Sequence, residues 1–177
     1  MSRSMALFMA GLALSFVAAS ASAAHIYCTA TGSTQGAFTG DATDVRNKGQ
    51  IPVLAFMQEI TASADSSTGA GAGKVQTQPF TITKAIDSTS VQFFLAAVTG
   101  ENFKSIVCQL VRETNTGEVH PYFRITLNNA RITDLKDSGD GVNGNAQGDD
   151  RERITFSFQK IELQDLDSAT SVTSTAQ

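Results

Sequence analysis

The segment QPFTITKAIDSTSVQFFLAAVTG, Gln78 to Gly100, decides the fold because its apolar periodicity changes halfway along. In the first half, Phe80 and Ile82 alternate with threonines, which is the period of two expected of a strand. In the second half, apolar residues recur at helical spacing. The segment therefore predicts a strand that runs directly into a helix.

The predicted helix has an apolar stripe and two end signals. The stripe consists of residues at i, i+3, i+4 and i+7, namely Val91, Phe94, Leu95 and Val98. Asp87 or Ser88 can accept hydrogen bonds from the first free N–H groups, and Gly100 can adopt the left-handed conformation that ends a helix. We expect about three turns, packed on a sheet through this stripe.

Apolar and alternating runs on both sides predict further strands at His25–Thr31, Ile51–Ile60, Lys74–Thr83, Phe103–Glu113, His120–Asp134 and Arg153–Gln164. The apolar parity changes after Phe158, which predicts a bulge near Gln159. Asn115-Thr116-Gly117 is typical of a hairpin turn, and Asp137 to Asp150 is typical of a long loop. The chain is predicted to be mainly β, a small barrel or folded sandwich with one helix.

Residues 1–23 have the three parts of a secretory signal peptide. Arg3 supplies the positive start, Ala6 to Ala19 is an apolar run, and Ala21-Ser22-Ala23 is a cleavage pattern. The run is shorter than the roughly 20 residues that a membrane-spanning helix needs, so we expect no permanent membrane anchor. The residues before Cys28 lack the small side chains of a lipidation signal. The sequence predicts a secreted or periplasmic protein.

After this segment, residues 24–165 are expected to form one domain, followed by a disordered polar tail at 166–177. The chain contains 13 Lys and Arg and 17 Asp and Glu residues, and Arg3 is the only charge in residues 1–23, so the remainder has a net charge of −5. An acidic chain without a cluster of cations argues against nucleic acid as a partner.

Cys28 and Cys108 are the two cysteines of the chain. An exported protein meets an oxidising compartment, where two thiols tend to form a disulfide. Closing a loop of this length would stabilise the fold by roughly 4 to 5 kcal/mol on the chain-entropy model. The alternative is a pair of buried free thiols.

Two glycine-rich segments resemble ligand-binding loops but lack essential residues. Residues 69–74 suggest a phosphate-binding loop, yet Thr68 replaces its first glycine and Val75 its magnesium-binding hydroxyl residue. Residues 137–145 suggest a calcium loop, yet Gly139 occupies a ligand position and the closing Glu is missing. We expect no nucleotide, metal or other cofactor.

His25 and His120 are the two histidines, and neither belongs to a zinc or nucleophile signature. Each is expected to be a surface or structural histidine. No serine nucleophile elbow or paired-carboxylate motif is present either, so we expect a protein that is not an enzyme.

Four blocks in order resemble the core of the Hcp family, the haemolysin co-regulated tube proteins of type VI secretion systems. They are Gly49–Phe56, Gln78–Phe103 with its strand and helix, Tyr122–Asn128 and Glu152–Ile161. The blocks span roughly two thirds of the chain. The resemblance implies a two-sheet β-barrel with one flanking helix, and hexameric rings stacked into a tube that a contractile sheath expels.

The resemblance also implies roles for the small-residue segment from Ser63 to Lys74. In the family such a loop reaches toward the neighbouring ring, which makes Ser66, Gly69, Gly71, Gly73 and Lys74 candidate ring-stacking residues. Spike and effector proteins of the secretion system are the other partners implied.

The signal and the resemblance lead to two hypotheses. The first is a self-associating tube protein of type VI secretion, for which either the signal is atypical or the true start lies later in the chain, with assembly in the cytoplasm in the latter case. The second is a periplasmic or extracellular binding or adhesive module that reuses the fold and is stabilised by a Cys28–Cys108 bond.

Overall fold

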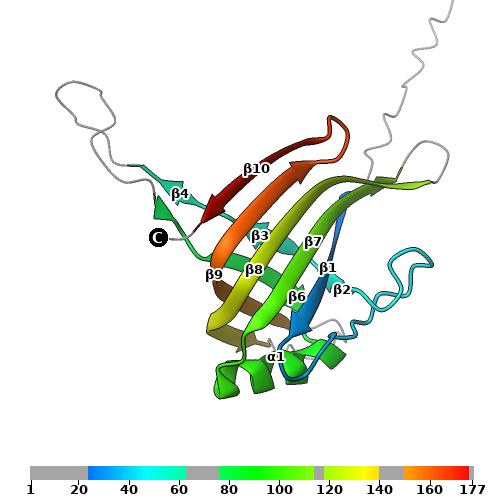
Figure 1. Ribbon diagram of the computed structural model, residues 1–177. Coiled ribbons are helices and arrows are strands. Elements are labelled where there is room, and N and C mark those ends of the chain that lie inside the picture. Colours follow the sequence, from blue (N-terminus) through cyan, green and yellow to red (C-terminus); the bar gives the residue numbers. More distant parts are fainter. Residues whose placement is uncertain (1–23, 63–75, 114–117, 140–149, 176–177) are drawn as a thin grey trace, which may run out of the picture.

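The computed structural model describes residues 24–62, 76–113, 118–139 and 150–175 (Figure 1). The predicted signal segment, the predicted turn at 115–117 and most of the predicted 137–150 loop lie outside these residues. In chain order the elements are β1 Ala24–Gly32, β2 Ile51–Val53, β3 Ala55–Met57, β4 Ile60–Thr61, β5 Gln76–Thr77, β6 Phe80–Ala85, α1 Ser88–Thr99, β7 Phe103–Glu113, β8 Val119–Ser138, β9 Arg151–Asp165 and β10 Thr170–Thr175.

Eight of the strands form one curved antiparallel sheet that nearly closes into a barrel. The order is β2-β1-β7-β8-β9-β6-β3, and β10 pairs with the part of β9 that β6 leaves free. The two edge strands, β2 and β3, are consecutive parts of one segment. The short link between β2 and β3 therefore brings the two edges of the sheet close together. The predicted mainly β, barrel-like fold with one helix is confirmed.

The predicted single strand Ile51–Ile60 is divided into three. β2 pairs with β1, whereas β3 pairs with β6 on the other edge, so the chain must change partners at Leu54. The Leu54 N–H already donates to the Thr83 carbonyl of β6 at 2.8 Å. Barrel closure, which the local alternation of residues cannot indicate, causes this division.

The predicted bulge near Gln159 is wrong, although the change in parity is real. Inward residues change sides at the same level in two strands, between Leu127 and Ala130 in β8 and between Phe158 and Ile161 in β9. At this level Asn129 has a φ of 50°, and its side-chain amide donates to Gln159 Oε1 at 2.6 Å. Both strands bend together there, and the register shift lies further on, between Ile132 and Asp134.

The predicted disorder of the tail is also wrong for residues 170–175. They form β10, which pairs antiparallel with β9 and places Val172 opposite Leu163. Threonine and valine favour strands, and the ladder satisfies their backbone groups without requiring apolar side chains. A polar composition alone therefore did not exclude a strand.

The predicted ends of α1 are confirmed, but its predicted buried face is wrong. Asp87 caps the first turn, accepting from the Thr89 N–H at 2.8 Å, and Gly100 ends the helix at φ 64°. The buried side chains are Thr89, Phe93 and Ala96, whereas the predicted stripe, Val91, Phe94, Leu95 and Val98, is exposed. Helical spacing supports either stripe, and α1 buries the one whose phenylalanine meets other rings at the end of the barrel.

Figure 1 shows α1 at one end of the barrel, and Phe93 of this helix belongs to a buried cluster of aromatic rings. Its ring lies edge-on to Phe38 and to Phe156, with centroids 5.1 and 6.2 Å apart. Phe103 contacts the same three rings. The cluster joins α1 to β7, β9 and the segment after β1.

A buried ion pair holds the start of α1. Lys84 of β6 and Glu152 of β9 face each other in register, and both side chains are fully buried. Lys84 Nζ lies 3.1 Å from Glu152 Oε2 and 2.7 Å from Asp87 Oδ1 of the helix cap. Ser90 also donates to Glu152 Oε2, at 3.0 Å. The position of α1 on the barrel is thus set by charge as well as by packing.

Candidate functional site

The predicted ring-stacking residues, Ser66, Gly69, Gly71, Gly73 and Lys74, lie outside the described residues. The strands on either side are described: β4 and β5 pair antiparallel, with Ile60 opposite Thr77. Figure 1 shows this two-stranded ribbon leading away from the barrel, far from α1.

Polar contacts attach the ribbon to the barrel. The Gln78 N–H donates to the Glu59 carbonyl at 2.9 Å, and Gln58 Nε2 donates to the Gln78 carbonyl at 3.3 Å. Thr77 Oγ1 lies 3.0 Å from Ser174 Oγ of β10. Both ends of the candidate stacking segment therefore start from fixed positions.

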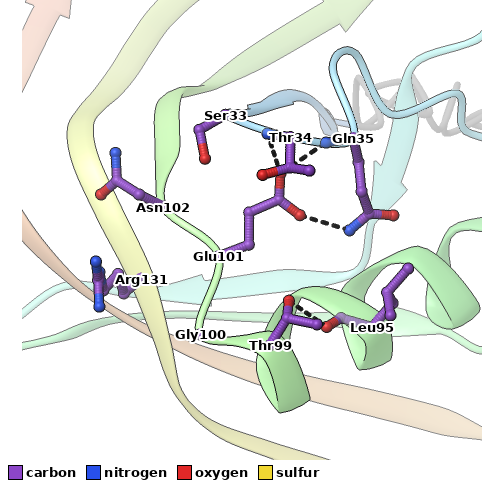
Figure 2. Close-up of a pocket in the computed structure, with 9 residues that line it drawn as sticks. All are labelled: Ser33, Thr34, Gln35, Leu95, Thr99, Gly100, Glu101, Asn102 and Arg131. Carbon is purple, nitrogen blue, oxygen red and sulfur yellow. Dashed lines mark hydrogen bonds between the residues drawn. The ribbon is translucent and has the colours of Figure 1, made fainter.

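A cavity of about 330 Å³, lined mostly by polar residues, lies at the other end of the molecule, where α1 ends (Figure 2). The segment after β1, the last turn of α1, the link into β7 and one residue of β8 surround it. The lining residues are Ser33, Thr34, Gln35, Leu95, Thr99, Gly100, Glu101, Asn102 and Arg131.

Glu101 organises one wall of this cavity. Its side chain is buried, and Oε1 accepts from the backbone N–H groups of Thr34 at 2.7 Å and Gln35 at 2.8 Å. Gln35 Nε2 donates to Oε2 at 2.7 Å, as Figure 2 shows. A Cβ on Gly32 would collide with this carboxylate, so the close approach requires glycine.

The carboxylate is also held in its charged form. Burial by itself would raise the pKa of Glu101, but the bonds from Gln35 and Thr34 outweigh burial and lower the pKa below its ordinary 4.5. The wall is therefore a charged, hydrogen-bonded clasp that joins the end of α1 to the segment after β1.

We expect Glu101→Gln to lower the free energy of unfolding by about 1–3 kcal/mol at pH 7, because two backbone donors lose a charged acceptor. Since folding lowers the pKa, the contribution is fully present above pH 4.5 and is lost as the pH falls through the folded pKa. Urea unfolding of the parent and the variant should thus differ most near neutrality and converge in acid. Glu59→Gln, at an exposed carboxylate, is the control and should change the unfolding of the dissociated monomer little. A difference between Glu101→Gln and the parent that is independent of pH would contradict this account.

Cys28 and Cys108 are joined by a disulfide, the first of the two alternatives that the sequence left open. They face each other across β1 and β7, and each is 1% exposed. Ile51 and Ile125 extend the same inward row on either side. The bond therefore joins two neighbouring strands inside the core and not at the surface.

The two histidines lie on the surface, one of the two places that the sequence predicted for them. His25 and His120 are both exposed, and His120 Nε2 lies 2.7 Å from Asp167 Oδ1. Among residues 24–62, 76–113, 118–139 and 150–175, no group of three or more His, Cys, Asp or Glu side chains is arranged to hold a metal ion. No helix in that part of the chain is both long enough and apolar enough to span a bilayer.

Sequence reasoning missed Glu101, Arg131 and the buried Lys84–Glu152 pair. Signals for the pair were present. Lys84 has the same inward parity as Phe80 and Ile82 in β6, and Glu152 has the same inward parity as Ile154 and Phe156 in β9. Two opposite charges at inward positions indicate a buried ion pair. Glu101 and Arg131 had no comparable signal.

Comparisons with known proteins agree with this architecture. Residues 27–164 match the family described as "Type VI secretion system effector, Hcp". The "Major exported protein" of Pseudomonas aeruginosa is 29% identical over 134 residues, which cover 72% of this chain and 78% of that protein.

Solved structures have the same fold. A structure titled "Crystal structure of Hcp protein" is similar with a TM-score of 0.78 at 18% identity, covering 88% of this chain and 99% of the other. The "Secreted protein Hcp3 from Pseudomonas aeruginosa" has a TM-score of 0.68 at 24% identity, covering 86% and 99%. The family match runs from β1 to β9 and includes the helix, and the chain therefore belongs to the Hcp family of type VI secretion.

Proposed function

We propose that this protein is a tube subunit of a type VI secretion system, which forms hexameric rings that stack through the segment between β4 and β5. The main support is that the family match extends over residues 27–164, from β1 to β9, and not over a single motif.

The β4–β5 ribbon suits a contact between rings. It leads away from the barrel, and hydrogen bonds from Gln78 and Gln58 hold its base. The segment that it carries is rich in Gly and Ala, which bury little apolar surface, so contact with a neighbour would depend mainly on backbone hydrogen bonds. Spike and effector proteins would be partners of the assembled tube.

Purified protein is expected to form closed rings, seen in negative-stain micrographs and by light scattering as the mass of a ring. A ring closes because head-to-tail contacts with a suitable rotation leave no contact surface unpaired. Removing residues 66–73 should weaken the stacking of rings but leave single rings and the barrel intact, because a segment rich in Gly and Ala contributes little apolar surface to a core and tolerates shortening.

Replacement of residues 66–73 by a Gly/Ser linker of the same length is the control for the effect of shortening the loop. A strictly monomeric parent at high concentration would exclude the tube role and leave the fold assignment unaffected. Unchanged stacking after the deletion would exclude the role of residues 66–73.

A second candidate is an exported binding or adhesive module. The predicted signal at residues 1–23 together with the buried Cys28–Cys108 bond favours it, since both are typical of proteins that mature outside the cytoplasm. N-terminal sequencing of the native protein decides the matter: a chain that still begins at Met1 excludes this candidate.

A further inference from the structure

The outward side of α1 is apolar and uncharged. Its side chains Val91, Phe94, Leu95 and Val98, called here the helix face, are 75, 56, 47 and 64% exposed. Their spacing places them in one stripe. The twelve residues of α1 include no charged side chain. A helix that only borders solvent normally carries charge on its outer side.

A contiguous apolar stripe of this kind marks an interaction surface, whereas single exposed apolar residues do not. The stripe is also rigid, because both ends of α1 are fixed. Lys84 bonds to Asp87 at the start, and the Glu101 N–H donates to the Ala96 carbonyl at the end, at 2.9 Å. A preorganised surface loses little conformational entropy when a partner binds.

The helix face continues into the cavity described above. Leu95 belongs to both, and Arg131 lines the cavity from β8 (Figure 2). Arg131 is exposed and makes no ion pair within the described residues. A fitting partner therefore brings apolar side chains to the helix and a carboxylate to its edge.

The chain itself has a segment with these properties. Leu54, Met57 and Ile60 are 57, 49 and 56% exposed. Between Met57 and Ile60 lies Glu59, whose exposed carboxylate forms no ion pair with any described residue. This segment leads to β4, which Figure 1 shows away from α1.

We propose that the helix face receives the Leu54–Ile60 segment of a second copy of this chain, with Arg131 beside Glu59 of that copy. The two surfaces differ, so a pair of copies still has one unused helix face and one unused Leu54–Ile60 segment. Further copies can bind to these, as in rings or stacks. A membrane is a poorer partner, because helices that lie on membranes carry Lys or Arg along their polar side and α1 carries none. The proposal rests on the proposed function and identifies the subunit contact.

The first test substitutes the apolar part of the contact in the full chain. Phe94→Gln with Val98→Gln should raise the concentration at which the assembly half dissociates by about tenfold or more. Val172→Gln is the matched control, since Val172 is 63% exposed and Val98 64%. Light scattering over a dilution series measures assembly, and circular dichroism checks that each variant is folded.

The second test exchanges the charges. Arg131→Glu and Glu59→Arg should each weaken assembly by about tenfold, and the double variant should recover most of the loss. Recovery would not occur if each residue acted only within its own barrel.

Three results would overturn the proposal: unchanged assembly in Phe94→Gln/Val98→Gln, an equal loss in Val172→Gln, or no recovery in the charge exchange. In each case the parent still assembles, so the tube role stands. A parent that remains monomeric at all concentrations would overturn both.

Discussion

Replacing both cysteines, Cys28→Ala with Cys108→Ala, is expected to lower the free energy of unfolding by about 4 to 5 kcal/mol on the chain-entropy model. The bond joins residues 80 positions apart, so its loss greatly increases the freedom of the unfolded chain. Such a loss is large compared with a total stability of about 5–15 kcal/mol. Urea unfolding followed by circular dichroism measures it.

The parent unfolded in the presence of a reductant is the control, because it keeps both sulfur atoms in the core and removes only the bond. It should lose nearly as much stability as the double variant. A decrease in the free energy of unfolding below about 1 kcal/mol in both would contradict the prediction, because removal of a native disulfide typically costs more than this. Protein from its native source should also show no thiol reactive with a maleimide after denaturation.

Phe93→Ala is expected to cost about 3–5 kcal/mol, the range for a large ring removed from a packed core. Phe93 is 1% exposed and contacts Phe38, Phe103 and Phe156. The resulting cavity would lie where α1, β7 and β9 meet, a site with little freedom to collapse. Thermal and urea unfolding measure the effect.

The neighbouring Phe94→Ala is the matched control for Phe93→Ala. Phe94 is 56% exposed, so its removal should change the free energy of unfolding by about 0.5 kcal/mol or less when measured on the dissociated monomer. The sequence alone predicted a large loss for Leu95→Ala, and the structure, in which Leu95 is 47% exposed, reverses that expectation. Equal losses for Phe93→Ala and Phe94→Ala would mean that this orientation of α1 is wrong.

Two of the wrong expectations about strands have the same cause. The division of Ile51–Ile60 into β2, β3 and β4 and the pairing of 170–175 as β10 both depend on which strand lies alongside. Alternation along one segment reports whether it can be a strand, and it contains no information on the partner. Partners far apart in sequence decide where a strand breaks or begins.

The candidate site was predictable only in part. The disulfide could be proposed from two cysteines behind an export signal, and the alternative of free thiols remained until Cys28 and Cys108 were placed opposite each other. The cavity around Glu101 could not be predicted, because Thr34, Gln35 and Arg131 meet Glu101 only after the barrel has formed.

By itself the sequence determined the mainly β class, the strand–helix junction at Phe80 to Gly100, both ends of α1 and the family, because alternation and helix capping are local properties. Only the tertiary structure decided which stripe of α1 is buried, where barrel closure breaks the β2–β3 segment and that Lys84 meets Glu152. The physical reason is that two stripes of α1, the predicted one and the buried one formed by Thr89, Phe93 and Ala96, both fit helical spacing. Contact with rings from distant strands, not periodicity, selects the one that faces the core.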